Sequence, residues 1–224
     1  AIWDSLRHGK IRFRMVVAQV AETGFHSQPV VILTGAFTGA VLAAQALAAL
    51  LAAPVIGFDT ESKPTFLKGE VSTGPHLVQL ATGEHVFLLP VSFAANHEVL
   101  RRILSAADIL KVGLGLGNDR SVLRSRLGIE LNNVLDLGEA MRGPGHRGTV
   151  GAKVAVAHYF GQKFQKSKKV GTSNWANPRL NERQLLYAAN DAHVALQLYH
   201  AWLRDPKHRE PGATAINSQE TTHG

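Results

Sequence analysis

The sequence predicts an α/β fold in which a mixed central β-sheet is flanked by α-helices within a single domain. With 224 residues the chain is long enough for one substantial domain with its own core, and short for two. Apolar runs of strand type dominate the first half, and patterns of helical type dominate the second half. This order favours a layered mixed sheet over a regular β-α-β repeat.

The expected elements follow from apolar periodicity and from turn and capping residues. The strands are expected at residues 29–35, from 55 onward, 77–81, 85–89 and 109–113, with a short apolar piece at 132–137; helices are expected at 38–52, 96–106, 118–127 and 181–204. The turn Thr82-Gly83-Glu84 predicts a hairpin. Asn181 followed by Gln184 three residues later predicts a capping box at the start of the last helix.

The chain is expected to contain one folded unit with two tails. We place the domain at residues 29–205 and treat residues 1–28 as an N-terminal extension of unassigned structure. Residues 206–224 are rich in Thr, Ser, Gly and Gln without an apolar period, so we expect a disordered tail there.

Composition excludes several classes of protein. The chain has no cysteine, which excludes disulfides, thiolate zinc sites and a cysteine nucleophile. The uncharged stretch 35–58 is Ala-rich and interrupted by Pro54, so it reads as a buried helix followed by a strand, not as a membrane span. The N-terminal charges precede no apolar core of signal-peptide type. We therefore expect a cytoplasmic, bacterial protein with no membrane partner.

Positive charge is concentrated in one part of the sequence. The net charge is +7, from 24 Lys and Arg against 17 Asp and Glu. Residues 140–181 contain no Asp or Glu and eight cationic side chains: Arg142, Arg147, Lys153, Lys163, Lys166, Lys168, Lys169 and Arg179. A solvated surface normally mixes the signs, so this stretch indicates a polyanionic partner such as nucleic acid.

Four acidic side chains stand where strands end or on a helix among apolar neighbours. Asp59 and Glu61 are two apart in a strand and so share one face, which places like charges side by side. Taken alone, this pair is as consistent with a salt-bridged strand end as with a metal site. Asp119 opens a helix, and Asp191 lies mid-helix one turn after Tyr187. Together, four carboxylates without cysteine are ligands of the kind that Mg²⁺ or Mn²⁺ prefers.

A glycine-rich turn offers an alternative interpretation. Gly113, Gly115 and Gly117 have the spacing G-x-G-x-G, whereas a dinucleotide-binding turn needs G-x-G-x-x-G. Asp136 lies about 20 residues on, where a ribose-binding acid is expected. Because this interpretation gives the other acids no role, we expect no dinucleotide cofactor.

Three ordered motifs resemble the DEDD 3′-5′ exonucleases of the ribonuclease H-like fold, in the branch that carries tyrosine. "FDTE" resembles the first exonuclease motif, "VGLGLGNDRSVL" the second and "YAAND" the third. "KSKK", "SNW" and "LNERQLLYAANDAHV" are similar to the Werner-type group, with ribonuclease D as a close relative. The resemblance implies two Mg²⁺ or Mn²⁺ ions, with Asp59, Glu61, Asp119 and Asp191 as their ligands and Tyr187 orienting the attacking water.

The third motif departs from the usual pattern at two positions. Asn190 stands where Thr is common, and His193 where Tyr is common. Position 186 is Leu, which excludes the histidine branch. Neither departure removes a ligand.

The expected function is removal of nucleotides from the 3′ end of nucleic acid as nucleoside 5′-monophosphates, with DNA favoured over RNA. Residues expected to contact nucleic acid are Lys166, Lys168, Lys169, Asn174 and Trp175. Trp175 has an alternative as a core anchor, and Asn174 as a brace within its loop. The alternatives for the whole protein are ribonuclease D-like processing of RNA 3′ ends and a weakly active nucleic-acid-binding module.

Overall fold

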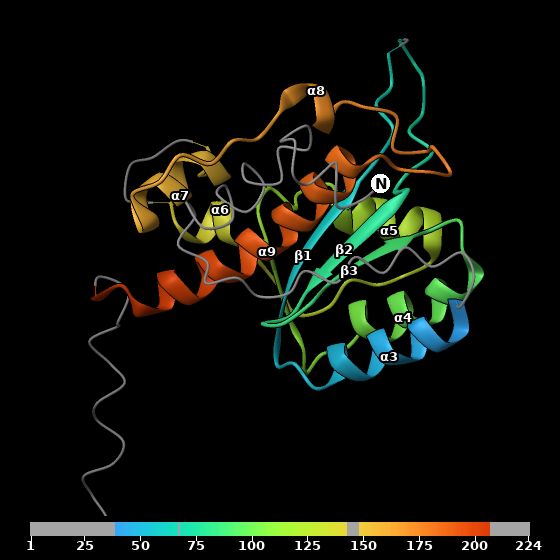
Figure 1. Ribbon diagram of the computed structural model, residues 1–224, viewed down its shortest axis with the longest axis horizontal. Helices are drawn as coiled ribbons and strands as arrows, with labels where there is room; N and C mark the ends of the chain where they lie inside the picture. The colour runs from blue at the N-terminus through green and yellow to red at the C-terminus, as the bar shows by residue number, and fades with distance from the viewer. Residues whose placement is uncertain (1–38, 67, 143–147, 207–224) are drawn as a thin grey trace, which may run out of the picture.

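A computed structural model describes residues 39–66, 68–142 and 148–206, and the side chains from residue 44 onward. The expected N-terminal extension, the expected strand at 29–35 and the expected tail after residue 206 lie outside the described residues. The described part forms one layered α/β body (Figure 1).

The sheet has five strands in the order β3-β2-β1-β4-β5. The strands are β1 (Val55–Glu61), β2 (Leu77–Ala81), β3 (Val86–Pro90), β4 (Leu110–Gly113) and β5 (Val134–Asp136). β2 pairs antiparallel with β1 and with β3, whereas β4 pairs parallel with β1 and with β5. The sheet is therefore mixed, as predicted, and β1 lies at its centre.

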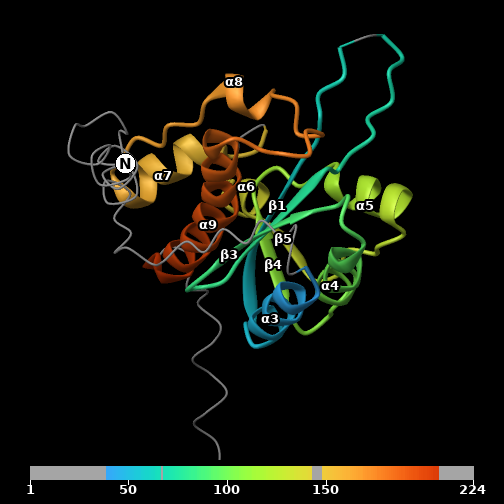
Figure 2. The same cartoon turned by 45° about the vertical axis from the view of Figure 1, so that its right-hand side comes forward.

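Helices cover both faces of the sheet (Figures 1 and 2). They are α3 (Gly39–Leu51), α4 (Ala94–Leu104), α5 (Asp119–Leu127), α6 (Leu137–Ala140), α7 (Ala152–Phe160), α8 (Lys168–Gly171) and α9 (Glu182–Arg204). α3, α4 and α5 pack on one face, where Ile56 and Phe58 of β1 are fully buried. α9 crosses the other face and contacts β1, β2, β3 and β4. The two faces of β1 therefore point to different helices.

The expected hairpin and the expected capping box are both confirmed. β2 and β3 pair from Ala81↔Val86 to Leu77↔Pro90 around the turn. The Asn181 side chain accepts from Gln184 N at 3.0 Å, and the Gln184 side chain accepts from Asn181 N at 3.1 Å. This reciprocal pair satisfies two helix N–H groups and fixes where α9 begins.

One helix begins earlier than predicted. α4 starts at Ala94, and Asn96 is inside its first turn, where the side chain donates to Pro90 O at 2.8 Å. Asn96 thus ties the helix back to the end of β3 and does not cap it. Among the described helices none is both long enough and apolar enough to cross a membrane.

Candidate active site

Three carboxylates meet where the end of β1 faces the middle of α9. Asp59, Glu61 and Asp191 each offer an oxygen, and these oxygens all lie within 4.8 Å of one another. The strand alternation places both β1 acids on the face that α9 covers, as the sequence predicted. Oxygen donors at this spacing fit a hard divalent cation.

The close approach of β1 to α9 depends on a glycine. A Cβ placed on Gly57 would lie 2.0 Å from the carbonyl oxygen of Ala192. Gly57 is two residues before Asp59 on the same strand face, and Ala192 follows Asp191. The missing side chain therefore lets the two backbones meet and brings the carboxylates together.

Burial and mutual repulsion raise the pKa values of the clustered acids. Burial, followed by the charge of Asp191, raises the pKa of Asp59 well above its usual range. Burial, followed by the charge of Asp59, raises the pKa of Glu61 to about 9. Burial also raises the pKa of Asp191, against the opposing effect of Lys166. Divalent cations would reverse these shifts, because they stabilise the ionised forms, so the residues present fit such ions.

Asp119 lies beside this cluster on the opposite face of β1. Its carboxylate accepts a hydrogen bond from the hydroxyl of Thr60, whose side chain points away from Asp59 and Glu61. Burial raises the pKa of Asp119, while the Thr60 bond lowers it. The charge of Asp119 contributes to the raised pKa values of both β1 acids. Asp119 is thus near the cluster without being one of its three members.

Asp136 holds the glycine-rich turn that leads to Asp119. Its carboxylate accepts from Gly115 N at 3.1 Å and from Leu116 N at 2.7 Å, and it also caps α6 by accepting from Gly138 N at 2.8 Å. These three bonds engage the carboxylate in the protein's own backbone. The ribose-binding role that the dinucleotide alternative would give Asp136 is therefore disfavoured.

Tyr187 lies one turn before Asp191, at the edge of the cluster. Its ring centroid is 5.3 Å from Lys166 Nζ and 6.0 Å from the ring centroid of Trp175. Burial, followed by the charge of Asp191, raises the pKa of the Tyr187 phenol. A Cβ on Gly171 would lie 2.7 Å from the Tyr187 hydroxyl oxygen, so Gly171 leaves room for that group. The phenol is consequently held protonated beside the carboxylates.

Lys166 is the cation nearest the acids. Its Nζ lies 2.7 Å from Asp191 Oδ2, with the Asp191 side chain only 5% exposed. Burial lowers the pKa of Lys166, but the carboxylates of Asp191 and Asp59 outweigh it and raise the pKa above its usual value. The sequence predicted Lys166 as a contact for nucleic acid and did not predict this ion pair.

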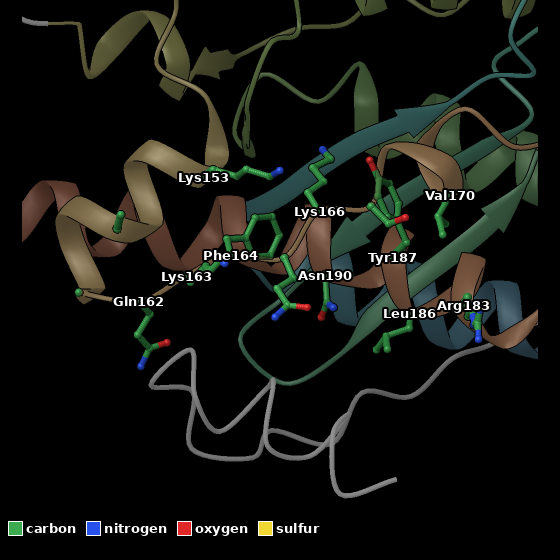
Figure 3. Close-up of a pocket in the computed structure, with 14 residues that line it drawn as sticks. Lys153, Gln162, Lys163, Phe164, Lys166, Val170, Arg183, Leu186, Tyr187 and Asn190 are labelled. Carbon is green, nitrogen blue, oxygen red and sulfur yellow. The ribbon is translucent and has the colours of Figure 1, made fainter. Parts of the chain in front are cut away.

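A cavity of about 920 Å³ opens beside Lys166 and Tyr187 (Figure 3). The described part of its lining has four cations and no Asp or Glu: Lys153, Lys163, Lys166 and Arg183. Figure 3 shows the Lys153 side chain extending toward Lys166. A second cavity, of about 460 Å³, shares Lys153, Lys166 and Tyr187 and adds Lys168. The positive stretch of the sequence thus contributes to a basic surface next to the acids.

The other expected nucleic-acid contacts have mixed placements. Lys168 lines the second cavity, whereas Lys169 is exposed and is absent from the described lining of both cavities. Asn174 is exposed, and its side chain accepts from Ala176 N at 3.1 Å within its own loop. Trp175 is 2% exposed, and its indole N–H donates to Gly171 O at 3.1 Å. Its burial is at odds with base stacking and fits the core anchor.

Comparison with known proteins identifies relatives of this arrangement. A family model described as 3′-5′ exonuclease matches residues 36–205. The chain is 30% identical over 148 residues to the mouse bifunctional 3′-5′ exonuclease/ATP-dependent helicase WRN, covering 65% of this chain and 10% of that protein. It is 31% identical over 175 residues to the exonuclease mut-7 homolog of Aedes aegypti, covering 66% of this chain and 23% of that protein. The chain therefore spans less than a quarter of either relative.

Solved structures agree with the fold. The Aedes aegypti Nibbler EXO domain has a TM-score of 0.59 at 27% identity, covering 71% of this chain and 82% of that one. Trypanosoma brucei RNase D has a TM-score of 0.70 at 21% identity, covering 80% and 66%. Escherichia coli RNase D has a TM-score of 0.63 at 24% identity, covering 78% and 44%. Both RNase D likenesses concern the fold alone.

The mixed sheet, with acids at the end of its central strand and on the helix that crosses it, defines a ribonuclease H-like domain of nuclease type. Within that class the chain belongs to the 3′-5′ exonuclease family, whose model matches residues 36–205.

Proposed function

We propose that this chain hydrolyses the terminal phosphodiester bond at the 3′ end of nucleic acid and releases nucleoside 5′-monophosphates, using two divalent ions. The observation that carries the proposal is the convergence of Asp59, Glu61 and Asp191 to within 4.8 Å beside a basic cavity. Family membership over residues 36–205 supports the same activity.

The residues have distinct proposed roles. Asp59, Glu61 and Asp191 would hold the divalent ions together with Asp119, which lies beside this cluster. When bound, such ions lower the pKa of a water and stabilise the leaving oxygen. Mg²⁺ and Mn²⁺ both suit these oxygen donors.

Tyr187 is proposed to orient the attacking water. Its hydroxyl stays protonated, because the raised pKa keeps the proton on the phenol, so the group can both donate and accept a hydrogen bond. The water oxygen loses a proton and forms a bond to phosphorus, while the bond from phosphorus to the 3′ oxygen breaks and that oxygen takes up a proton. The shortened strand keeps a 3′-hydroxyl, and the released nucleotide carries the 5′-phosphate.

The basic cavity is proposed to bind the strand next to the scissile bond. Lys153, Lys163 and Arg183 line it together with Lys166, and buried Phe164 adds an apolar part. Cations contact phosphates without reading sequence, and apolar surface favours the faces of unpaired bases. We propose a single-stranded 3′ end as the bound form and DNA as the preferred substrate, on the similarity to the Werner-type group.

Digestion of matched substrates tests this proposal. Single-stranded DNA, recessed duplex DNA and single-stranded RNA of one sequence are incubated with the full chain in Mg²⁺ and then in Mn²⁺. We expect 5′-mononucleotides from the 3′ end, fastest from DNA, and none from Asp59→Ala or Asp191→Ala although both variants fold. Undiminished release by either variant would refute the site assignment, and faster digestion of RNA would refute the substrate preference.

A further inference from the structure

The Lys166 ammonium lies where a metal ion bound to Asp191 would have to lie. It lies 2.7 Å from Asp191 Oδ2, within ion-pair distance of an oxygen that the proposed function gives to a divalent ion. The Asp191 side chain is 5% exposed, so this oxygen has little access to water as an alternative. An ammonium and a divalent ion repel each other, so each weakens the binding of the other to that oxygen.

Lys166 can leave this place without a change of fold. It belongs to the irregular segment at residues 162–167 between α7 and α8, and its side chain is 35% exposed. Phe164, 8% exposed, anchors the segment two residues earlier. The lysine stem is flexible, and Lys166 lines both basic cavities as well as touching the acids. A rotation of the side chain alone would move the ammonium from Asp191 into the cavity.

The charges favour such a movement when ions bind. Without ions, Lys166 offsets part of the negative charge of the three clustered acids. Two divalent ions carry four positive charges, which balance the four carboxylates of the proposed site. The ammonium is then surplus at Asp191, whereas a phosphodiester in the cavity brings one negative charge.

We propose that Lys166 is a metal-displaced phosphate ligand: it pairs with Asp191 when the ions are absent and contacts the terminal phosphate of the substrate once they are bound. This inference rests on the proposed function, because it takes Asp191 as a metal ligand. It makes Lys166 a positioning residue whose contribution to substrate binding depends on the ions. A cation that only lines the cavity contributes with or without them.

The first test is Mn²⁺ binding to the full chain by calorimetry without nucleic acid. Lys166→Met removes the competing cation, so we expect Mn²⁺ to bind roughly 10-fold more tightly or better, the size of a charge-assisted contact. Lys153→Met is the matched control, because Lys153 lines the same cavities and its replacement by Met removes the same charge. We expect Lys153→Met to raise the affinity for Mn²⁺ clearly less than Lys166→Met does. Lys166→Arg keeps the charge, so its affinity for Mn²⁺ should resemble that of the native chain.

The second test is the salt dependence of binding to a cleavage-resistant phosphorothioate single strand, with Mn²⁺ and with EDTA. With Mn²⁺, Lys166→Met should lower the slope of log Kd against log salt by about 0.7, the loss of one phosphate contact. With EDTA the same variant should leave the slope unchanged. Lys153→Met should lower it equally in both conditions.

Three outcomes would overturn the inference: Mn²⁺ affinity of Lys166→Met at or below that of the native chain, a gain no larger than that of Lys153→Met, or equal slope changes with Mn²⁺ and with EDTA. These failures differ from a failure of the proposed function, in which the native chain itself binds no Mn²⁺. Thermal unfolding confirms that each variant is folded before either measurement is read.

Discussion

Replacement of Gly57 by Ala tests how the fold brings the acids together. A Cβ at this position would lie 2.0 Å from Ala192 O, whereas ordinary contacts begin at 3.4 Å. β1 and α9 would have to separate by roughly 1.4 Å, the difference between these two distances, because a backbone oxygen cannot move aside by a side-chain rotation. Asp59 and Asp191 would separate with them.

Gly57→Ala should lower both the stability of the protein and its rate of nucleotide release. Overpacking of this kind costs about 1–3 kcal/mol, and the obstacle here is backbone, so we expect about 2 kcal/mol or more off the free energy of unfolding. For a domain of this size that corresponds to a fall in Tm of about 4–8 °C. Displacement of a catalytic group by about 1 Å can cost about 100-fold in rate, so nucleotide release should fall further than stability alone explains.

Urea unfolding and Mn²⁺ titration of Gly57→Ala give the measurement. Gly83→Ala is the matched control, because a Cβ there meets nothing within 4 Å; its free energy of unfolding should stay within about 0.5 kcal/mol of native. If Gly57→Ala kept native stability and native Mn²⁺ affinity, the close approach of β1 to α9 would not be what assembles the site.

Three further predictions concern single side chains. Tyr187→Phe removes the hydroxyl and keeps the ring, so kcat should fall by about 100-fold or more while calorimetry shows native Mn²⁺ affinity; a native kcat would exclude a role for the hydroxyl. Asp136→Ala removes the acceptor of three backbone N–H groups, so urea unfolding should show a free energy of unfolding lower by about 1–3 kcal/mol. An unchanged free energy of unfolding would show that Asp136 does not stabilise the turn. In the metal-free protein the pKa of Glu61 rises from 4.5 to about 9, so the native state binds more protons than the unfolded state between these values. The stabilising contribution of Glu61 is complete below pH 4.5 and is lost as pH rises through 9, so the Mn²⁺-free Tm should fall over this window and should fall less in Glu61→Gln. A Tm that does not fall over this window, or that falls equally in Glu61→Gln, would contradict this prediction.

The local geometry of the site was predictable from the sequence. Two-residue alternation placed Asp59 and Glu61 on one strand face, and four-residue spacing placed Tyr187 and Asp191 on one helix face. Those rules depend only on backbone periodicity. The strands and the helix between the first two motifs were likewise readable from apolar runs and turn residues. The helices α6, α7 and α8, between the second motif and the third, were not individually predicted.

Contacts between segments without periodicity were not predictable. The bond from Thr60 to Asp119 depends on where α5 begins relative to the end of β1. The loop that leads into α9 has no apolar period, so nothing in it distinguished a buried Trp175 from an exposed one. Lys166 was predicted to contact phosphate from charge alone, whereas its pairing with Asp191 depends on the path of an irregular segment.

The number of Mn²⁺ ions bound per chain, measured by electron paramagnetic resonance, tests whether acids from three motifs form a site for two divalent ions. We expect two ions on the native chain, and a rise in Tm on their addition. Asp59→Asn, which removes one carboxylate of the three-acid cluster, should lose both the bound ions and the rise in Tm. A native chain that binds no Mn²⁺, or an Asp59→Asn variant that binds two ions with native affinity, would show that these acids do not form the divalent-ion site.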